Sequence, residues 1–160
     1  MNYEHMLSEN FRDLKKTAIK EKANYINAKP FPNITLANFF NDSFLSEILK
    51  EFPDLSKMKD SQNYNVKNEI KLSNKNYFSF PSKIKTFIDF LNSDIFLSFL
   101  QNVTSIKENL ISDPQLEGGG LHEIKSGGVL KILKSTCAAL IRVLYFNTFG
   151  LALKPIVVKL

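Results

Sequence analysis

Residues Leu116–Leu133 read LEGGGLHEIKSGGVLKIL, the one stretch where glycines, a histidine and alternating apolar residues occur together. The alternation predicts two strands, Gly118–Ile124 and Val129–Leu133, joined by a KSGG turn. The Gly-Gly pair suits such a turn, because glycine reaches positive φ at no steric cost. The GGG run at the start of the first strand indicates a bulge, or a place where another group approaches the backbone closely.

Upstream of this stretch, apolar residues recur at helical spacing and predict four helices. Asn41-Asp42-Ser43 and Ser93 are suitable N-caps, and Pro81 suits a helix start. The first predicted helix is 5–24, and the second has an apolar face that runs from Phe44 to Phe52. The third opens at Pro81-Ser82 and has the stripe Ile84, Phe87, Ile88 and Leu91; the fourth follows Ser93, with Phe96, Leu97 and Leu100 facing inward. A short helical turn is expected at Thr104–Leu110.

Extended segments are predicted around these helices. Pro30 and Pro32 force an extended path into a short strand at Ile34–Asn38. The polar segment Asp54–Phe80 is expected to be a long loop with a short strand near Ile70–Leu72. Its Tyr64 and Asn68 could meet a substrate or simply pack on the surface. A last strand is predicted at Ile156–Lys159.

Composition narrows the class of protein. The chain of 160 residues, 44% of them hydrophobic, is long enough for one globular domain. The net charge is +5, but the lysines alternate with acids instead of forming the clustered stripe of a nucleic-acid binder, so we expect no nucleic-acid partner.

Cysteine content and hydropathy bear on location. The single cysteine, Cys137, excludes an internal disulfide and a cysteine-rich zinc site, and its apolar neighbours indicate a buried or half-buried side chain rather than a nucleophile. The N-terminus lacks the apolar core of a signal peptide. The most apolar segment, Val143–Leu153, is shorter than the about 20 residues of a membrane span. We therefore expect a cytoplasmic protein with no membrane partner.

Several separate segments resemble the iron(II)/2-oxoglutarate-dependent oxygenases of the prolyl 4-hydroxylase-like group. The resemblance covers Ala28 to Ile132 and is specific for the family, not for a substrate. Besides LEGGGLHEIKSGGVLKI, it rests on NAKPFP at 27–32, the segment 34–40, ILKEFP at 48–53, NEIKL at 68–72, FLNS at 90–93 and FLSFL at 96–100.

The resemblance implies a particular fold and activity. The fold would be α+β, with N-terminal helices packed on a partial double-stranded β-helix, or jelly roll, whose C-terminal strands are missing. The cofactors would be Fe(II) and 2-oxoglutarate, and the reaction would be hydroxylation of a C–H bond in a small molecule or peptide. A peptidyl proline, another amino acid, a sugar and a metabolite all remain open as substrate.

The iron ligands of this family are replaced in the chain. In such enzymes a His-x-Asp pair lies on the second strand of the stretch, and counting from Gly127 places that pair at Leu133 and Ser135. Leucine has no donor atom, and a neutral hydroxyl is a poor substitute for a carboxylate in a facial triad of two histidines and one carboxylate. No histidine follows His122 to supply the third ligand. We therefore expect no metal ligands, no bound cofactor and no catalytic residues in this chain.

His122 is the residue that could still carry chemistry. Strand alternation places it on one face with Gly120 and Ile124, and Glu123 on the other. The resemblance implies that His122 and Ile124 line the 2-oxoglutarate pocket. His122 could act as an acid or base or as a hydrogen-bond donor, or it could be a packed histidine with one hydrogen bond. His5 has no ligand partner at a suitable spacing.

The glycine run does not indicate phosphate binding. It lacks the GxxxxGK[ST] of a P-loop and the strand–GxGxxG–helix order of a dinucleotide fold.

After Leu133 the chain changes character. Residues 134–154 contain no acids, and Arg142–Asn147 resembles the family's next core strand only at a spacing several residues too short. A frameshift, a truncation or a decayed gene would produce such a change.

We therefore treat 1–160 as a single incomplete oxygenase domain, family-like over 28–132 and divergent over 133–160. The alternative is a non-catalytic binding or interaction module derived from that fold. A half-built barrel exposes strand edges, so we also expect marginal stability or an oligomer that covers the edges.

Overall fold

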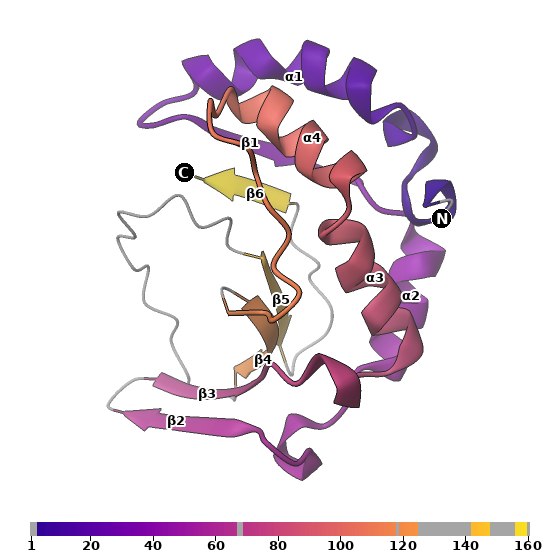
Figure 1. The fold of residues 1–160 in the computed structure, drawn as a ribbon, viewed down its shortest axis with the longest axis vertical. Helices are drawn as coiled ribbons and strands as arrows, with labels where there is room; N and C mark the ends of the chain where they lie inside the picture. Colours follow the sequence, from indigo (N-terminus) through magenta and orange to yellow (C-terminus); the bar gives the residue numbers. More distant parts are fainter. Residues whose placement is uncertain (1–2, 67–68, 118, 125–141, 148–155, 160) are drawn as a thin grey trace.

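The structure, a computed structural model, describes residues 3–66, 69–117, 119–124, 142–147 and 156–159. Helices and strands occur together in these ranges, which confirms the predicted α+β class (Figure 1). The helices are α1 (Leu14–Asn27), α2 (Asp42–Glu51), α3 (Ser82–Leu91) and α4 (Asp94–Thr104), with 3-10 turns η1 (Glu4–Met6), η2 (Glu9–Phe11), η3 (Leu55–Lys57) and η4 (Tyr77–Ser79). The strands are β1 (Asn33–Leu36), β2 (Gln62–Val66), β3 (Glu69–Asn74), β4 (Gly119–Ile124), β5 (Arg142–Asn147) and β6 (Ile156–Lys159).

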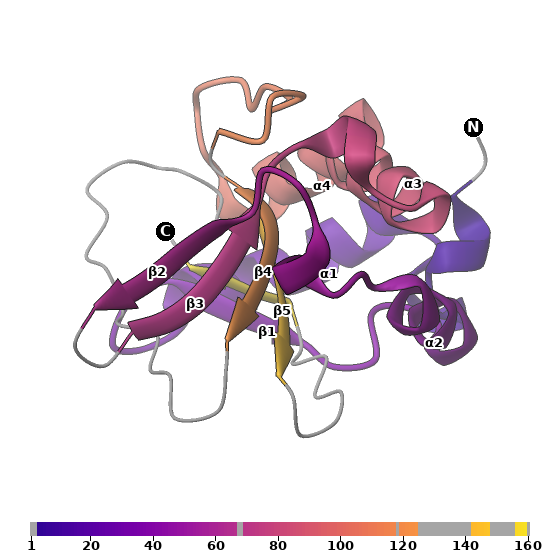
Figure 2. The ribbon, with the colours of Figure 1, turned by 90° about the horizontal axis from the view of Figure 1, so that it is seen from below.

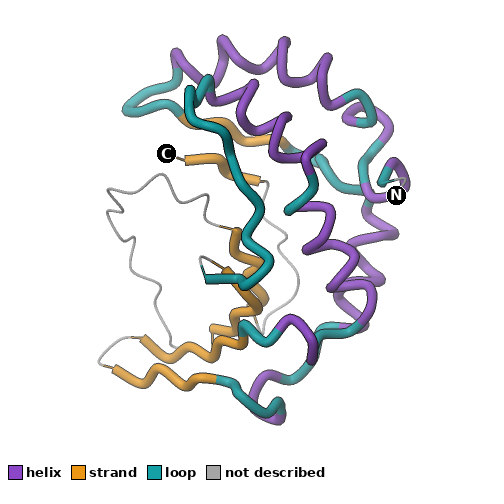
Figure 3. The backbone as a smooth tube through the Cα atoms, in the orientation of Figure 1, coloured by secondary structure: helices purple, strands orange, loops and turns teal. Residues whose placement is uncertain are grey.

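The helices form an outer arc beside the strands (Figure 3). α1 packs along α4, and α3 packs against both α2 and α4. Phenylalanines fill the space between them because each helix carries an apolar stripe at helical spacing. Phe39 is the centre of this core, with its ring within 5.0–6.3 Å of Phe11, Phe40, Phe96 and Phe99.

The N-caps predicted from sequence are confirmed. Asn41 Oδ1 accepts hydrogen bonds from the backbone N–H groups of Ser43, at 2.9 Å, and Phe44, at 3.4 Å. Ser93 Oγ accepts from the N–H of Phe96 at 3.3 Å. These acceptors satisfy backbone donors that have no partner inside the helix, so α2 and α4 begin where the local sequence predicts.

Two helical predictions are wrong. The first helix begins at Leu14 and not near residue 5, because Leu7 pairs with Phe40 and the backbone N–H of Ser8 donates to the carbonyl of Phe39 at 3.1 Å. The helical turn expected at Thr104–Leu110 is absent beyond Thr104, the last residue of α4, because the C-cap residue Ser105 has a left-handed φ of 59°.

The main sheet has the strand order β2-β3-β4-β5, in which the first three strands are antiparallel and β5 runs parallel to β4 (Figure 2). The strand expected near Ile70–Leu72 is confirmed and extends over Glu69–Asn74. Its partner β2 was not predicted, so the long loop expected over Asp54–Phe80 contains a hairpin instead.

The remaining strands match the predictions in part. β1 ends at Leu36, two residues before the predicted end, and Asn38 has a φ of 54°. The predicted final strand is confirmed as β6, which pairs antiparallel with β1. β4 also matches its prediction, and Leu121–Ile124 are paired with β3 on one side and with β5 on the other. Val129–Leu133 itself lies outside the described residues.

The two faces of the β2-β3-β4 sheet differ. Leu72 and Leu121 are buried on one face and join the same cluster as the phenylalanines of the helices. His122 and Ile124, on the other face, are only half-buried. The sheet therefore presents one face to the helical core and a second face that the core does not cover. Within the described ranges, no helix combines the length and the apolar character needed to cross a bilayer.

Candidate functional site

Strand register gathers six side chains on the face of the sheet away from the helical core. Ser73 pairs with His122 and Lys71 with Ile124 across β3 and β4, while Gln62 and Tyr64 of β2 pair with Ser73 and Lys71. Directly paired residues in an antiparallel sheet project to the same side. We call this set the His122 face: Gln62, Tyr64, Lys71, Ser73, His122 and Ile124.

Polar contacts link the members of the His122 face that come from β2 and β3. The Tyr64 hydroxyl donates to Gln62 Oε1 at 2.6 Å, and Lys71 Nζ lies 5.1 Å from the centre of the Tyr64 ring. An ammonium over an aromatic ring is attracted by the negative face of the ring. These contacts hold Lys71 over the sheet, on the side where His122 lies.

The environment of His122 keeps its imidazole neutral. Burial, together with the positive charge of Lys71, lowers the pKa of His122 to about 4 from an ordinary value of 6.5. Both causes disfavour the imidazolium form. At pH 7 the ring therefore carries one N–H donor and one nitrogen acceptor, and beside it stands an ammonium group that can only donate. Such a pair can hydrogen-bond a carbonyl or carboxylate oxygen of a ligand.

The position of His122 depends on a close contact between β4 and β3. Gly120 has a φ of +132°, and a Cβ added there would lie 2.7 Å from the carbonyl oxygen of Asn74. The close approach predicted from the GGG run is therefore real, and the group that approaches is the backbone of β3. A side chain added at Gly120 would therefore collide with the backbone of β3.

Asn74 fixes the same end of β3. It is 1% exposed, and its Nδ2 donates to the carbonyl of Lys59 at 3.0 Å and to Ser61 Oγ at 3.1 Å. Its Oδ1 accepts from the N–H of Asn76 at 2.8 Å. The amide thus ties the end of β3 to the segment that leads into β2.

The residues present do not fit the iron of an oxygenase. On the His122 face the imidazole of His122 is the one group of the kind that binds iron in a facial triad. Glu123 pairs with Leu72 and so belongs to the opposite face, as predicted. Leu133 and Ser135 lie outside the described residues, but their side chains cannot replace a histidine and a carboxylate. No group of three His, Cys, Asp or Glu that could hold a metal is found within the described ranges.

Other residues considered from the sequence lie elsewhere. The His5 ring packs edge-on against Phe44 with 5.8 Å between ring centres, far in sequence from any other candidate. Asn68 and Cys137 lie outside the described residues. Sequence reasoning missed Gln62, Lys71 and Ser73, because their link to His122 depends on a hairpin that the polar sequence of 54–80 did not reveal.

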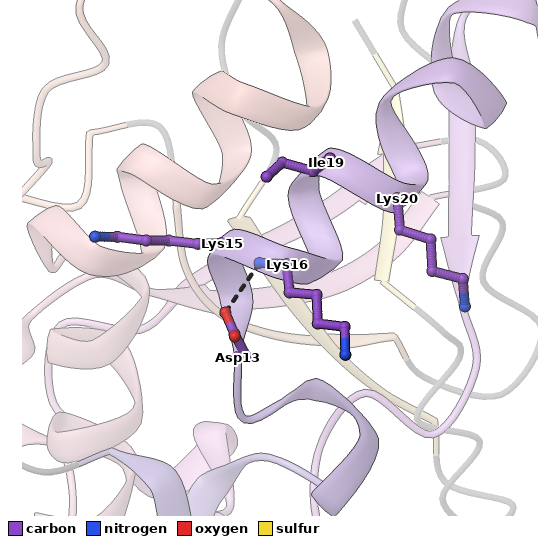
Figure 4. A pocket seen from close by; sticks show the side chains of 5 residues that line it. All are labelled: Asp13, Lys15, Lys16, Ile19 and Lys20. Atoms are coloured by element: carbon purple, nitrogen blue, oxygen red, sulfur yellow. Dashed lines mark hydrogen bonds between the residues drawn. The ribbon is translucent and has the colours of Figure 1, made fainter.

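A surface hollow lies on α1 and not at the His122 face. It is lined by Asp13, Lys15, Lys16, Ile19 and Lys20 (Figure 4). Asp13 Oδ1 accepts from the backbone N–H of Lys16 at 2.9 Å, so this carboxylate caps the helix. The lysine side chains extend outward and do not converge on a common point, which is not the geometry of a catalytic site.

Comparisons of the chain with models of protein families, with curated proteins and with solved structures found no match.

Proposed function

We propose that the chain corresponds to the N-terminal part of an iron(II)/2-oxoglutarate-dependent dioxygenase, a hydroxylase of the prolyl 4-hydroxylase-like group. The observation that supports this proposal is the position of the LEGGGLHEI segment within the fold. It forms β4 inside the main sheet, with the helices on one face and His122 on the other. In this proposal the sheet is part of a double-stranded β-helix whose inner face is the His122 face. The parallel pairing of β5 with β4 departs from the antiparallel strands of a jelly roll.

We further propose that the chain as it stands does not catalyse the hydroxylation. Iron bound at a facial triad supplies the activation of dioxygen in this family, and Leu133 and Ser135 stand where two of its ligands belong. What this chain retains is the neutral imidazole of His122 beside Lys71, which can position a ligand oxygen but cannot by itself hold a metal.

Anaerobic titration with Fe(II) and 2-oxoglutarate tests the proposed inactivity. A chelate of iron and 2-oxoglutarate in a facial site absorbs visible light by charge transfer. We expect no such band with this chain, and none with the His122→Gln variant as a matched control. A band that appears with the unaltered chain would overturn the proposed inactivity. Iron would then be bound by side chains other than Leu133 and Ser135, which cannot serve as its ligands.

A second candidate function is a non-catalytic binding module that uses the His122 face. The observation in its favour is the cluster of a neutral imidazole, an ammonium and a phenol within one small sheet. The probe is 2-oxoglutarate without metal, and its binding is monitored through the NMR signals of residues in β3 and β4. We expect Lys71→Gln to weaken any binding and Lys75→Gln, an exposed lysine at the end of β3, to leave it unchanged. Equal affinities of the two variants would exclude the His122 face as the site.

The abrupt change in sequence after Leu133 has its own test at the level of the gene. Reading the other frames downstream of Lys131 should recover a His-x-Asp pair if a frameshift caused the change. Absence of such a pair from every frame would rule out the frameshift.

A further inference from the structure

The outward face of α1 carries an apolar stripe bordered by lysines. Leu14, Ala18 and Tyr25 face the core, while Ile19 is 80% exposed and Ile26 is 46% exposed. Ile19, Ala23 and Ile26 follow one another at spacings of four and three residues, so they form one line along the helix. Lysines lie on both sides of this line: Lys15 and Lys22 on one, Lys16 and Lys20 on the other.

The positive charge of this face is largely unbalanced. Lys20 lies 3.6 Å from Glu21, but none of Lys15, Lys16 and Lys22 has an acidic partner within 4 Å among the described residues. The one acid beside the stripe, Asp13, is used as the cap of α1. Figure 4 shows Lys16 and Lys20 extending along the same side of the helix, with Ile19 between them and Lys15. The face therefore attracts negative charge.

The segments outside the described residues have no acidic side chains that could neutralise this charge. Those segments are 1–2, 67–68, 118, 125–141, 148–155 and 160, and together they contain no Asp or Glu. An acidic occupant of the α1 face must therefore come from another molecule.

We propose that the outward face of α1 is a docking surface for an acidic amphipathic helix of a partner protein. The spacing fits a helix pair, because Ile19 and Ile26 are seven residues apart and Ala23 between them permits close approach. With Ile19 and Ile26 at d positions, Lys16 and Ala23 are a positions, and Lys15, Lys20 and Lys22 occupy the flanking e and g positions. A single lysine at an a position is tolerated in a helix pair and helps to fix its register. Glutamates at e and g of a partner helix would pair with them. An anionic bilayer is the weaker match, since two isoleucines present little apolar surface for insertion.

The test uses the full chain and a synthetic helical peptide of three heptads, with leucine at a and d and glutamate at e and g. Fluorescence anisotropy of the labelled peptide measures affinity, and NMR shift changes locate the site. We expect binding that maps to α1 and weakens with salt. The double variant Lys20→Glu/Lys22→Glu, at the e and g positions, should weaken binding by about tenfold or more, because it turns attraction to the glutamates of the peptide into repulsion.

Matched variants separate this surface from general stickiness. Ile19→Ser should weaken peptide binding by about tenfold through lost apolar contact, while Ile111→Ser, at an equally exposed isoleucine, should leave it unchanged. All four substituted positions are exposed, so the variants should keep the fold. Absence of peptide binding, equal effects of the two isoleucine variants, or binding to phosphatidylserine vesicles in place of the peptide would each overturn the proposal.

Discussion

Gly120 shows how one residue sets the geometry of the candidate site. Its φ of +132° and the carbonyl of Asn74, 2.7 Å from where a Cβ would lie, leave no room for a side chain. β3 and β4 approach each other closely at this point, one residue pair away from Ser73 and His122. The glycine therefore allows the contact that places the imidazole beside β3.

Gly120→Ala should lower the free energy of unfolding by at least about 2 kcal/mol, because it adds both a strained φ and a clash with backbone. Urea unfolding measures the loss. Gly119→Ala, at a glycine without positive φ, is the matched control and should cost less. Similar losses for the two variants would show that the close approach is not what requires glycine at 120.

The protonation of His122 is also decided at the scale of the residue. Its pKa in the folded chain is about 4, below the value of 6.5 expected in the unfolded chain. Between these two values the unfolded state binds more protons, so the free energy of unfolding decreases as pH falls from 6.5 to 4. This part of the stability is fully present above pH 6.5.

The variant His122→Gln should lack that part of the pH dependence. Urea unfolding at pH 7.5 and at pH 5, on the variant and on the unaltered chain, measures it. We expect the unaltered chain to lose more stability between the two values than the variant does. Equal losses would mean that His122 titrates normally in the folded state.

Lys71→Met should raise the pKa of His122 without restoring it to 6.5, because burial is the larger cause of its depression and the charge of Lys71 the smaller. NMR titration of the imidazole signals gives the pKa directly. Lys75→Met removes a lysine that does not influence His122 and should leave the pKa unchanged. A pKa that does not move in Lys71→Met would separate Lys71 from the site.

At the scale of elements, the helices follow local rules and the hairpin does not. α2, α3 and α4 begin at or next to the residues that their caps and apolar stripes predict. β2, with the sequence QNYNV, has no apolar alternation, and its polar pattern predicts a loop. Its strand conformation depends on pairing with β3, an interaction that a local pattern does not contain.

Asn41→Ala should destabilise the chain by about 1 kcal/mol, because two N–H groups at the start of α2 lose their acceptor. Asn41→Asp keeps an acceptor oxygen and should be close to neutral. Thermal unfolding followed by circular dichroism compares the two. If both variants lose the same stability, the cap of α2 does not act through the side-chain oxygen.

At the scale of the whole molecule, the edge strands of the main sheet bear most on association with other chains. Among the described strands, β2 forms one edge of the main sheet and β5 the other. The exposed edge of β2 carries Asn63, Tyr64 and Asn65, and no charged side chain protects this part of it. Unprotected strand edges favour pairing with another chain.

We expect the chain to associate as its concentration rises, or to unfold readily when kept dilute. Sedimentation velocity over a range of concentrations measures association. Asn65→Lys, which places a charge on the β2 edge, should reduce it, while Asn102→Lys, on an exposed turn of α4, should not. A monodisperse monomer with a sharp, reversible thermal transition would contradict the expectation.

Much of the arrangement can be predicted from local pattern alone. The caps at Asn41 and Ser93, the apolar stripes of α3 and α4, the strand at β4 and the crowding at the GGG run all follow from residue type and spacing.

The neighbours of His122 cannot be predicted in this way. Contacts between distant segments place Lys71, Tyr64 and Gln62 on the same face as His122. Such contacts also bring the carbonyl of Asn74 against Gly120, and they pair Leu7 with Phe40 where the local sequence predicts a helix. The residues next to a position in sequence set its preference for helix or strand. Strand register and burial depend instead on the long-range pairing that buries the most apolar surface and satisfies the most backbone hydrogen bonds.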